Sequence, residues 1–131
     1  MYLLDTNIFL EALLDQEKTE VVHNFLKSTT LDKIFITDLA LHSIGIILFN
    51  LKKHELFNIF VDDMVKNGMN IISLSTSELT DLSEIASNFN LDFDDSYQYL
   101  AAKIKDFQLI SFDKDFDKTD INRNEPQEIV Q

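Results

Sequence analysis

The sequence contains no cysteine and no tryptophan. The lack of cysteine excludes disulfide bonds and thiolate metal sites, so any metal ion must be held by oxygen or imidazole ligands. It also fits a protein of the cytosol. No positively charged leader precedes an apolar segment, and no apolar run approaches the roughly 20 residues that a membrane span needs. We therefore expect a soluble, cytoplasmic protein that does not cross a membrane.

Basic residues are scarce: 11 lysines and arginines stand against 23 aspartates and glutamates, and the net charge is −12. Arg123 is the sole arginine. A protein that binds nucleic acid by general electrostatic attraction carries a basic surface, so this class is disfavoured. If the substrate is RNA or DNA, metal ions in an acidic cleft must offset the repulsion between protein and phosphates. The charge therefore favours a metal-dependent site over a basic groove.

Apolar residues are plentiful: 45% of the 131 residues are hydrophobic, and 11 of these are phenylalanine. This composition is typical of a folded globular protein. The length fits one domain with a single core, and no internal repeat divides it. We therefore interpret residues 1–131 as a single domain.

Short apolar runs alternate with amphipathic segments along the chain. Runs of strand length predict strands at residues 2–4, 33–37, 70–74 and 107–112, and residues 128–130 could add a short edge strand. Helical spacing of apolar residues predicts helices over about 8–13, 17–26, 38–51, 54–64, 75–88 and 94–105. The alternation predicts an α/β fold of three layers, with helices on both faces of a mainly parallel sheet of four or five strands.

The helix predicted over 38–51 carries apolar residues around most of its circumference, so we expect it to be largely buried. Thr37 stands where it can cap the N-terminus of this helix. His42 and Ser43 are the unusual polar members. Buried polar groups are normally hydrogen-bonded. Residues such as these therefore more often form structural hydrogen bonds than take part in catalysis.

Several carboxylates stand at equivalent places in this pattern. Asp5 ends the first strand, Asp113 follows the fourth, and Asp94 and Asp95 open the helix before the fourth. Ligands of open α/β sheets bind at the carboxyl ends of the strands, so we expect these acids to meet at one rim. Mg²⁺ and Mn²⁺ prefer carboxylate and water oxygens, and grouped carboxylates repel one another unless a cation neutralises them. A divalent metal site is the simplest explanation.

Each acid taken alone also has a structural explanation. Asp5 can cap the following helix through its side chain. Negative charge in the first turn of a helix, as at Asp94 and Asp95, contributes about 0.3–1 kcal/mol per charge. Residues 113–124 do not qualify as a calcium-binding loop, because Lys118 replaces the glycine at the sixth position and Asn124 the glutamate at the twelfth.

Three short motifs together are similar to those of a known family. They are Leu4-Asp5-Thr6-Asn7, then Asp94-Asp95-Ser96 with Ala101 and Ala102 behind it, and Ser111-Phe112-Asp113-Lys114-Asp115-Phe116. In this order and spacing the chain resembles PIN-domain proteins, the small nuclease fold of the VapC-type toxins in prokaryotic toxin–antitoxin pairs. The resemblance covers nearly the whole chain and implies a PIN-like three-layer fold.

The resemblance also implies roles for individual residues. Asp5, Asp95 and Asp113 fall on the metal-binding, catalytic acids of the family, with Mg²⁺ or Mn²⁺ as the cofactor, and Asp94 and Asp115 are further candidate ligands. The residues implied in supporting roles are Thr6, Asn7, Ser43 and Ser111.

The chain departs from the family pattern at Ser43, because the family usually has a glutamate about six residues after the position of Thr37. Asp38, Asp94 or a water held by Ser43 could replace the missing fourth acid. Alternatively, the metal affinity could be low and the activity altered.

The resemblance implies a Mg²⁺- or Mn²⁺-dependent endoribonuclease that cleaves single-stranded or looped RNA as the toxin of a toxin–antitoxin pair. It further implies an antitoxin protein as partner and a homodimer. The alternative is a PIN-like binding module with weakened or absent catalysis that acts through protein contacts, as the missing glutamate would allow. A phosphatase of the haloacid type is disfavoured, because Asp5-Thr6-Asn7 lacks an aspartate two residues after the first.

Overall fold

The sheet has four parallel strands in the order β3-β2-β1-β4 in the computed structural model, which describes residues 1–130. The strands are β1 (Tyr2–Leu4), β2 (Ile34–Thr37), β3 (Asn70–Ile72) and β4 (Gln108–Ile110). β1 is a central strand, because it pairs in parallel with both β2 and β4. The predicted parallel sheet is confirmed, and the carboxyl ends of all four strands meet at one rim.

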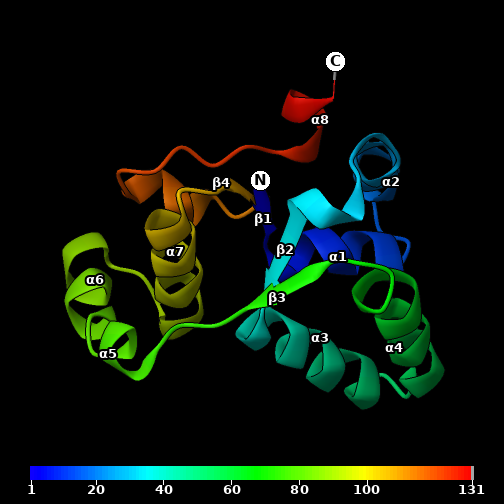
Figure 1. The fold of residues 1–131 in the computed structure, drawn as a ribbon, viewed down its shortest axis with the longest axis horizontal. Helices are drawn as coiled ribbons and strands as arrows, with labels where there is room; N and C mark the ends of the chain where they lie inside the picture. Colours follow the sequence, from blue (N-terminus) through cyan, green and yellow to red (C-terminus); the bar gives the residue numbers. More distant parts are fainter. Residues whose placement is uncertain (131) are drawn as a thin grey trace.

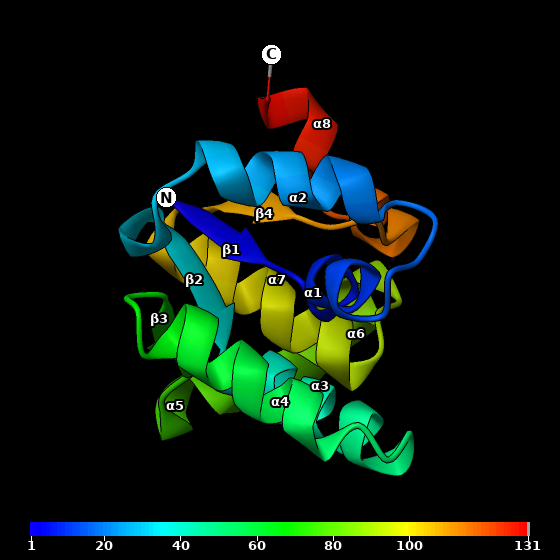
Figure 2. The ribbon, with the colours of Figure 1, turned by 90° about the vertical axis from the view of Figure 1, so that its right-hand side faces the viewer.

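Helices cover both faces of this sheet (Figure 1). They are α1 (Thr6–Leu13), α2 (Thr19–Ser28), α3 (Asp38–Asn50), α4 (His54–Phe60), α5 (Thr76–Leu79), α6 (Leu82–Phe89), α7 (Phe93–Lys105) and α8 (Pro126–Ile129). Helices α1 to α4 lie on one side of the sheet and α5 to α7 on the other. Figure 2 shows α8 beside α2, which it contacts. The three-layer α/β/α fold is therefore confirmed.

The two faces of β1 build two separate parts of the core. Leu4 is fully buried with Phe25 of α2 and Ile44 of α3. Its neighbour Leu3 is equally buried, but it packs with Tyr99 of α7 on the opposite face. Successive strand residues point to opposite faces, so a strand covered on both sides needs an uninterrupted apolar run. This need explains the apolar N-terminal segment.

The predicted edge strand at residues 128–130 is wrong, because this segment begins within helix α8. Pro126 occupies the first helical position, where its fixed φ and missing N–H favour a helix start. The Glu128 carboxylate accepts a hydrogen bond from the Glu125 N–H at 2.8 Å. The C-terminal segment instead contacts the sheet at a residue before α8, through an isolated parallel bridge between Asn124 and Ile110.

The single helix predicted over 75–88 is two helices, α5 and α6. Ser75 caps α5, since its Oγ accepts from the Glu78 N–H and Glu78 accepts from the Ser75 N–H. The helix stops one turn later, where the Thr80 hydroxyl donates to the Ser77 carbonyl at 2.6 Å. A side chain that bonds the backbone locally competes with continuation of the helix.

The expectation that residues 38–51 form a largely buried helix is also wrong. Only one stripe of α3 faces the core, formed by Ala40, Ile44 and Leu48. Ile46 and Phe49 are 63% and 49% exposed. The cap of this helix is confirmed, because Thr37 Oγ1 accepts from the Ala40 N–H at 3.0 Å.

Within residues 1–130, the helices are too short or too polar to cross a lipid bilayer.

Candidate metal centre

The junction of β1 and α1 places Asp5 at the carboxyl rim of the sheet. Asp5 has extended backbone angles and is the N-cap of α1, with its Oδ1 accepting from the Thr6 N–H at 2.9 Å. Its side chain lies in the interior, and the residue is only 7% exposed. The capping role and the placement in the site, which the sequence left as alternatives, therefore occur together.

Four hydrogen bonds hold the Asp5 carboxylate. Besides the Thr6 N–H, Oδ1 accepts from Gln98 Nε2 at 3.1 Å. Oδ2 accepts from Ser111 Oγ at 2.7 Å and from Asn7 Nδ2 at 3.3 Å. These donors come from α1, α7 and the end of β4. The orientation of Asp5 is therefore fixed by three elements.

Ser111 connects Asp5 with Asp113. While its hydroxyl donates to Asp5, the same oxygen accepts from the Asp113 N–H at 2.9 Å. The Asp113 carboxylate in turn caps the short 3-10 turn Lys114–Lys118 by accepting from the Asp115 N–H at 2.9 Å. Asn7 completes the arrangement, since its Oδ1 accepts from the Phe112 N–H at 3.3 Å.

Asp95 reaches the same rim from the first turn of α7. Asp92 caps this helix by accepting from the Asp95 N–H at 2.8 Å. The helix start is thereby fixed, and Asp95 is 8% exposed, whereas Asp94 is exposed.

These acids line one cavity of about 440 Å³. Its lining residues are Asp5, Thr6, Asn7, Leu10, Ser43, Ile46, Ile47, Asp92, Asp94, Asp95 and Asp113. α3 forms an apolar wall with Ile46 and Ile47, and Ser43 lies in that wall, half-buried. Ser111 and Asp115 are not among the lining residues, although both are joined to Asp113 by hydrogen bonds.

The pKa of Asp95 is raised to about 7, and burial is the main cause of this rise. Repulsion from the neighbouring acids Asp113, Asp92, Asp5 and Asp115 contributes to the same rise. The pKa of Asp5 is also raised, with burial as the main cause, while its hydrogen bonds from Ser111, Gln98 and Thr6 act in the opposite direction. Both shifts have the same physical origin, which is negative charge in a place with little solvent.

A carboxylate oxygen of Asp95, one of Asp113 and one of Asp115 all lie within 4.8 Å of one another. Asp5, which the sequence placed with Asp95 and Asp113, is outside this group. Over residues 1–130, ion pairs within 4 Å involve neither Asp95 nor Asp113, and Asp115 has only Lys118 at 3.4 Å. A group of three hard oxygen donors with a single cationic neighbour fits a divalent cation such as Mg²⁺ or Mn²⁺.

Two contacts of the site were missed from the sequence. Gln98 contacts Asp5, and a signal was available, because Gln98 follows Asp95 by three residues and so shares its face of α7. Arg123 donates to the Ser111 carbonyl at 3.0 Å, and no local pattern in the sequence indicates this contact.

Fold and site together define an α/β/α protein with a parallel sheet and a cluster of carboxylates at its carboxyl rim. The chain belongs to the PIN domain family, which matches residues 2–122. No curated protein sequence matches the chain.

Solved structures with the same fold include toxins. The chain is similar to VapC20 of Mycobacterium tuberculosis, a sarcin-ricin loop cleaving toxin, at 12% identity and a TM-score of 0.82, over 96% of this chain and 100% of the other. It is similar to a toxin–antitoxin complex from Klebsiella pneumoniae at 16% identity and 0.70, over 88% and 90%. It is also similar to FitAcB from Neisseria gonorrhoeae at 19% identity and 0.72, over 97% and 99%. At these identities the likeness shows the shared fold.

Proposed function

We propose that the chain is a Mg²⁺- or Mn²⁺-dependent endoribonuclease. One observation carries the proposal: Asp5, Asp95 and Asp113, which are far apart in the sequence, line one cavity at the carboxyl rim of the sheet. Asp95, Asp113 and Asp115 would hold the metal ion directly, because their oxygens are grouped closely enough. Asp5 would act from the back of the cavity, where four hydrogen bonds fix it.

The residues of the cavity divide the work between charge and exclusion of water. A bound divalent ion would supply Lewis acidity that activates water and positive charge that offsets the phosphate. Ser111 and Gln98 keep the Asp5 carboxylate in one orientation, since each donates to a different oxygen. Ile46 and Ile47 form a wall that lowers the local polarity, which strengthens electrostatic interactions inside the cavity.

RNA is the proposed substrate because a protein of the same fold, VapC20, is a sarcin-ricin loop cleaving toxin. A net charge of −12 disfavours binding of phosphates by a basic surface, which supports a role for the metal ion in holding the substrate.

We further propose that the chain acts as the toxin of a toxin–antitoxin pair, bound by an antitoxin protein, and that it forms a homodimer. Solved structures of this fold include a toxin–antitoxin complex. Three large apolar side chains on α3 and the turn after it are exposed to solvent. Their exposed fractions are 63% for Ile46, 49% for Phe49 and 50% for Leu51. Light scattering at micromolar concentration should give twice the mass of one chain, and a monomer would contradict the homodimer.

A nuclease assay tests the proposed activity. Cleavage of a structured RNA should require Mg²⁺ or Mn²⁺, stop on addition of chelator, and be lost in Asp95→Asn and Asp113→Asn. Asp32→Asn is the matched control, because Asp32 is an exposed acid at the opposite, amino-terminal edge of β2. Metal-independent cleavage, or equal cleavage by all three variants, would contradict the proposal.

Ser43 in the cavity wall supports a second candidate function. Because the site has a hydroxyl where the family usually has a carboxylate, the chain could bind metal weakly and act as a binding module through protein contacts. A protein that binds an antitoxin but does not cleave RNA under any metal condition would establish this alternative.

A further inference from the structure

The backbone of Ser111 is held by the chain segment that follows the family match. The Ser111 N–H donates to the Asn124 carbonyl at 3.0 Å. The Ser111 carbonyl accepts from Arg123 Nη1, also at 3.0 Å. The PIN family match ends at residue 122, so both contacts come from residues just beyond it. Ser111 is completely buried, and neither backbone group has water as an alternative partner.

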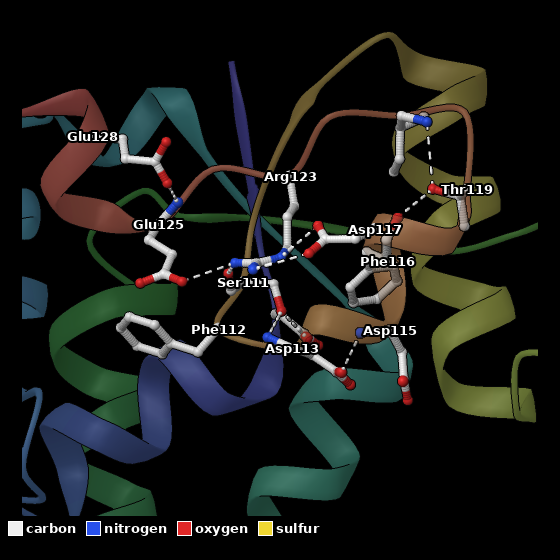
Figure 3. A network of polar contacts seen from close by, with 12 residues as sticks. Ser111, Phe112, Asp113, Asp115, Phe116, Asp117, Thr119, Arg123, Glu125 and Glu128 are labelled. Atoms are coloured by element: carbon white, nitrogen blue, oxygen red, sulfur yellow. Dashed lines mark hydrogen bonds and ion pairs between the residues drawn. The ribbon is translucent and has the colours of Figure 1, made fainter.

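The Arg123 guanidinium is fixed from three directions (Figure 3). Nε and Nη2 donate to the two carboxylate oxygens of Asp117, at 3.0 and 3.3 Å. Nη1 donates to Glu125 Oε2 at 2.9 Å in addition to the Ser111 carbonyl. The side chain is only 11% exposed. A planar guanidinium with several donors suits such an arrangement, and an ammonium group cannot reproduce it.

We infer that Arg123 is a positioning residue of the metal centre, acting through Ser111. The guanidinium fixes the Ser111 backbone, and the Ser111 hydroxyl then joins the Asp5 carboxylate to the Asp113 amide. This inference rests on the proposed metal-dependent function. Outer partners of metal ligands commonly matter by about 10- to 100-fold in metal affinity.

The direction of the effect separates positioning from simple charge. Arg123 is a cation near an anionic site and therefore repels Mn²⁺. If charge were its only effect, removal of Arg123 would strengthen the binding of Mn²⁺. Loss of positioning weakens binding instead. A weaker Mn²⁺ affinity in Arg123→Gln therefore cannot come from the lost charge.

Two measurements on the full chain test the inference. In chelator, the Asp113 amide should exchange its hydrogen about 10-fold faster in Arg123→Gln than in the parent protein, as expected for loss of local protection. Calorimetry with Mn²⁺ should give an affinity about 10-fold weaker. Lys103→Met is the matched control: it also removes one positive charge and an ion pair, to Asp120 at 2.7 Å, but Lys103 has no hydrogen bond to Ser111. Neither quantity should change in the control.

A double variant tests the route through Ser111. Ser111→Ala with Arg123→Gln should bind Mn²⁺ no more weakly than Ser111→Ala alone, because contributions along one chain of contacts are not additive. Full additivity, or unchanged or tighter Mn²⁺ binding in Arg123→Gln, would overturn the inference.

Further variants and outcomes keep the two proposals separate. If Arg123→Gln does not fold, Asp117→Asn loosens the same guanidinium without removing it, and the same two results are expected in smaller measure. If the parent protein does not bind Mn²⁺, the proposed metal-dependent function fails. The exchange rate of the Asp113 amide then decides alone, and an unchanged rate overturns the positioning role.

Discussion

Gln98 Nε2 donates a hydrogen bond to Asp5 Oδ1 over 3.1 Å, between residues 93 positions apart in the chain. The other end of the same amide accepts from Thr37 Oγ1 at 2.7 Å. Thr37 caps α3, which carries the apolar wall of the cavity. One buried side chain, 3% exposed, therefore connects Asp5, at the junction of β1 and α1, to the residue that caps α3.

Replacement of this amide should destabilise the fold. Gln98→Met keeps the approximate size of the side chain but removes the acceptor of the buried Thr37 hydroxyl and one of the four donors to Asp5. We expect this loss to cost about 1–3 kcal/mol in the free energy of unfolding. Urea denaturation measures the loss. Gln108→Met is the control, because Gln108 is exposed, and it should change stability far less. Equal effects of the two substitutions would show that the bridge contributes nothing.

Divalent ions should stabilise the folded chain. A ligand that binds only the folded state adds about 2.7 kcal/mol at a concentration of 100 Kd, so the unfolding temperature should rise with added Mn²⁺. The rise should be lost in Asp113→Asn and retained in Asp32→Asn. A Mn²⁺-dependent rise of equal size in Asp113→Asn would place the ion elsewhere.

Stability in chelator should fall as the pH rises from about 4 to about 7. The pKa of Asp95 is raised from 3.8 to about 7 by burial and by the surrounding acids. Between these values the folded state binds more protons than the unfolded state, so each step up in pH favours unfolding. Asp95→Asn should flatten this part of the curve, as measured by denaturation at a series of pH values. A parent curve that rises over this window would contradict the pKa shift.

Ser43 lies in the cavity wall, so an acid at this position would add an anionic oxygen to the site. Ser43→Glu should bind Mn²⁺ more tightly and raise any nuclease activity, because hard cations prefer carboxylate oxygens. Ser43→Gln is the control, because glutamine has nearly the size of glutamate but no charge. It should neither tighten Mn²⁺ binding nor raise the nuclease activity. A folded Ser43→Glu variant with unchanged Mn²⁺ affinity would show that position 43 cannot replace the missing ligand.

The sequence by itself was sufficient for the order of the four strands and of the helices between them, except that it predicted one helix in place of α5 and α6, and for the acids at the ends of these elements. Apolar runs, helical spacing and caps such as Thr37 are local signals, because each depends on residues within one or two turns of one another. Since parallel strands share a carboxyl rim, Asp5 and Asp113 could be placed at one edge from these signals alone. Asp95 followed from its position in the first turn of its helix.

Tertiary structure alone decided which groups touch. Gln98, Thr37 and Ser111 meet around Asp5 across separations of 61 to 106 residues, and Arg123 reaches back to Ser111. Packing likewise decided that Asp115, rather than Asp5, shares close oxygens with Asp95 and Asp113, and that α3 buries a single stripe. The periodicity of a segment shows that it has an apolar face, but the neighbours that cover that face and the partners of each polar atom depend on how distant segments pack.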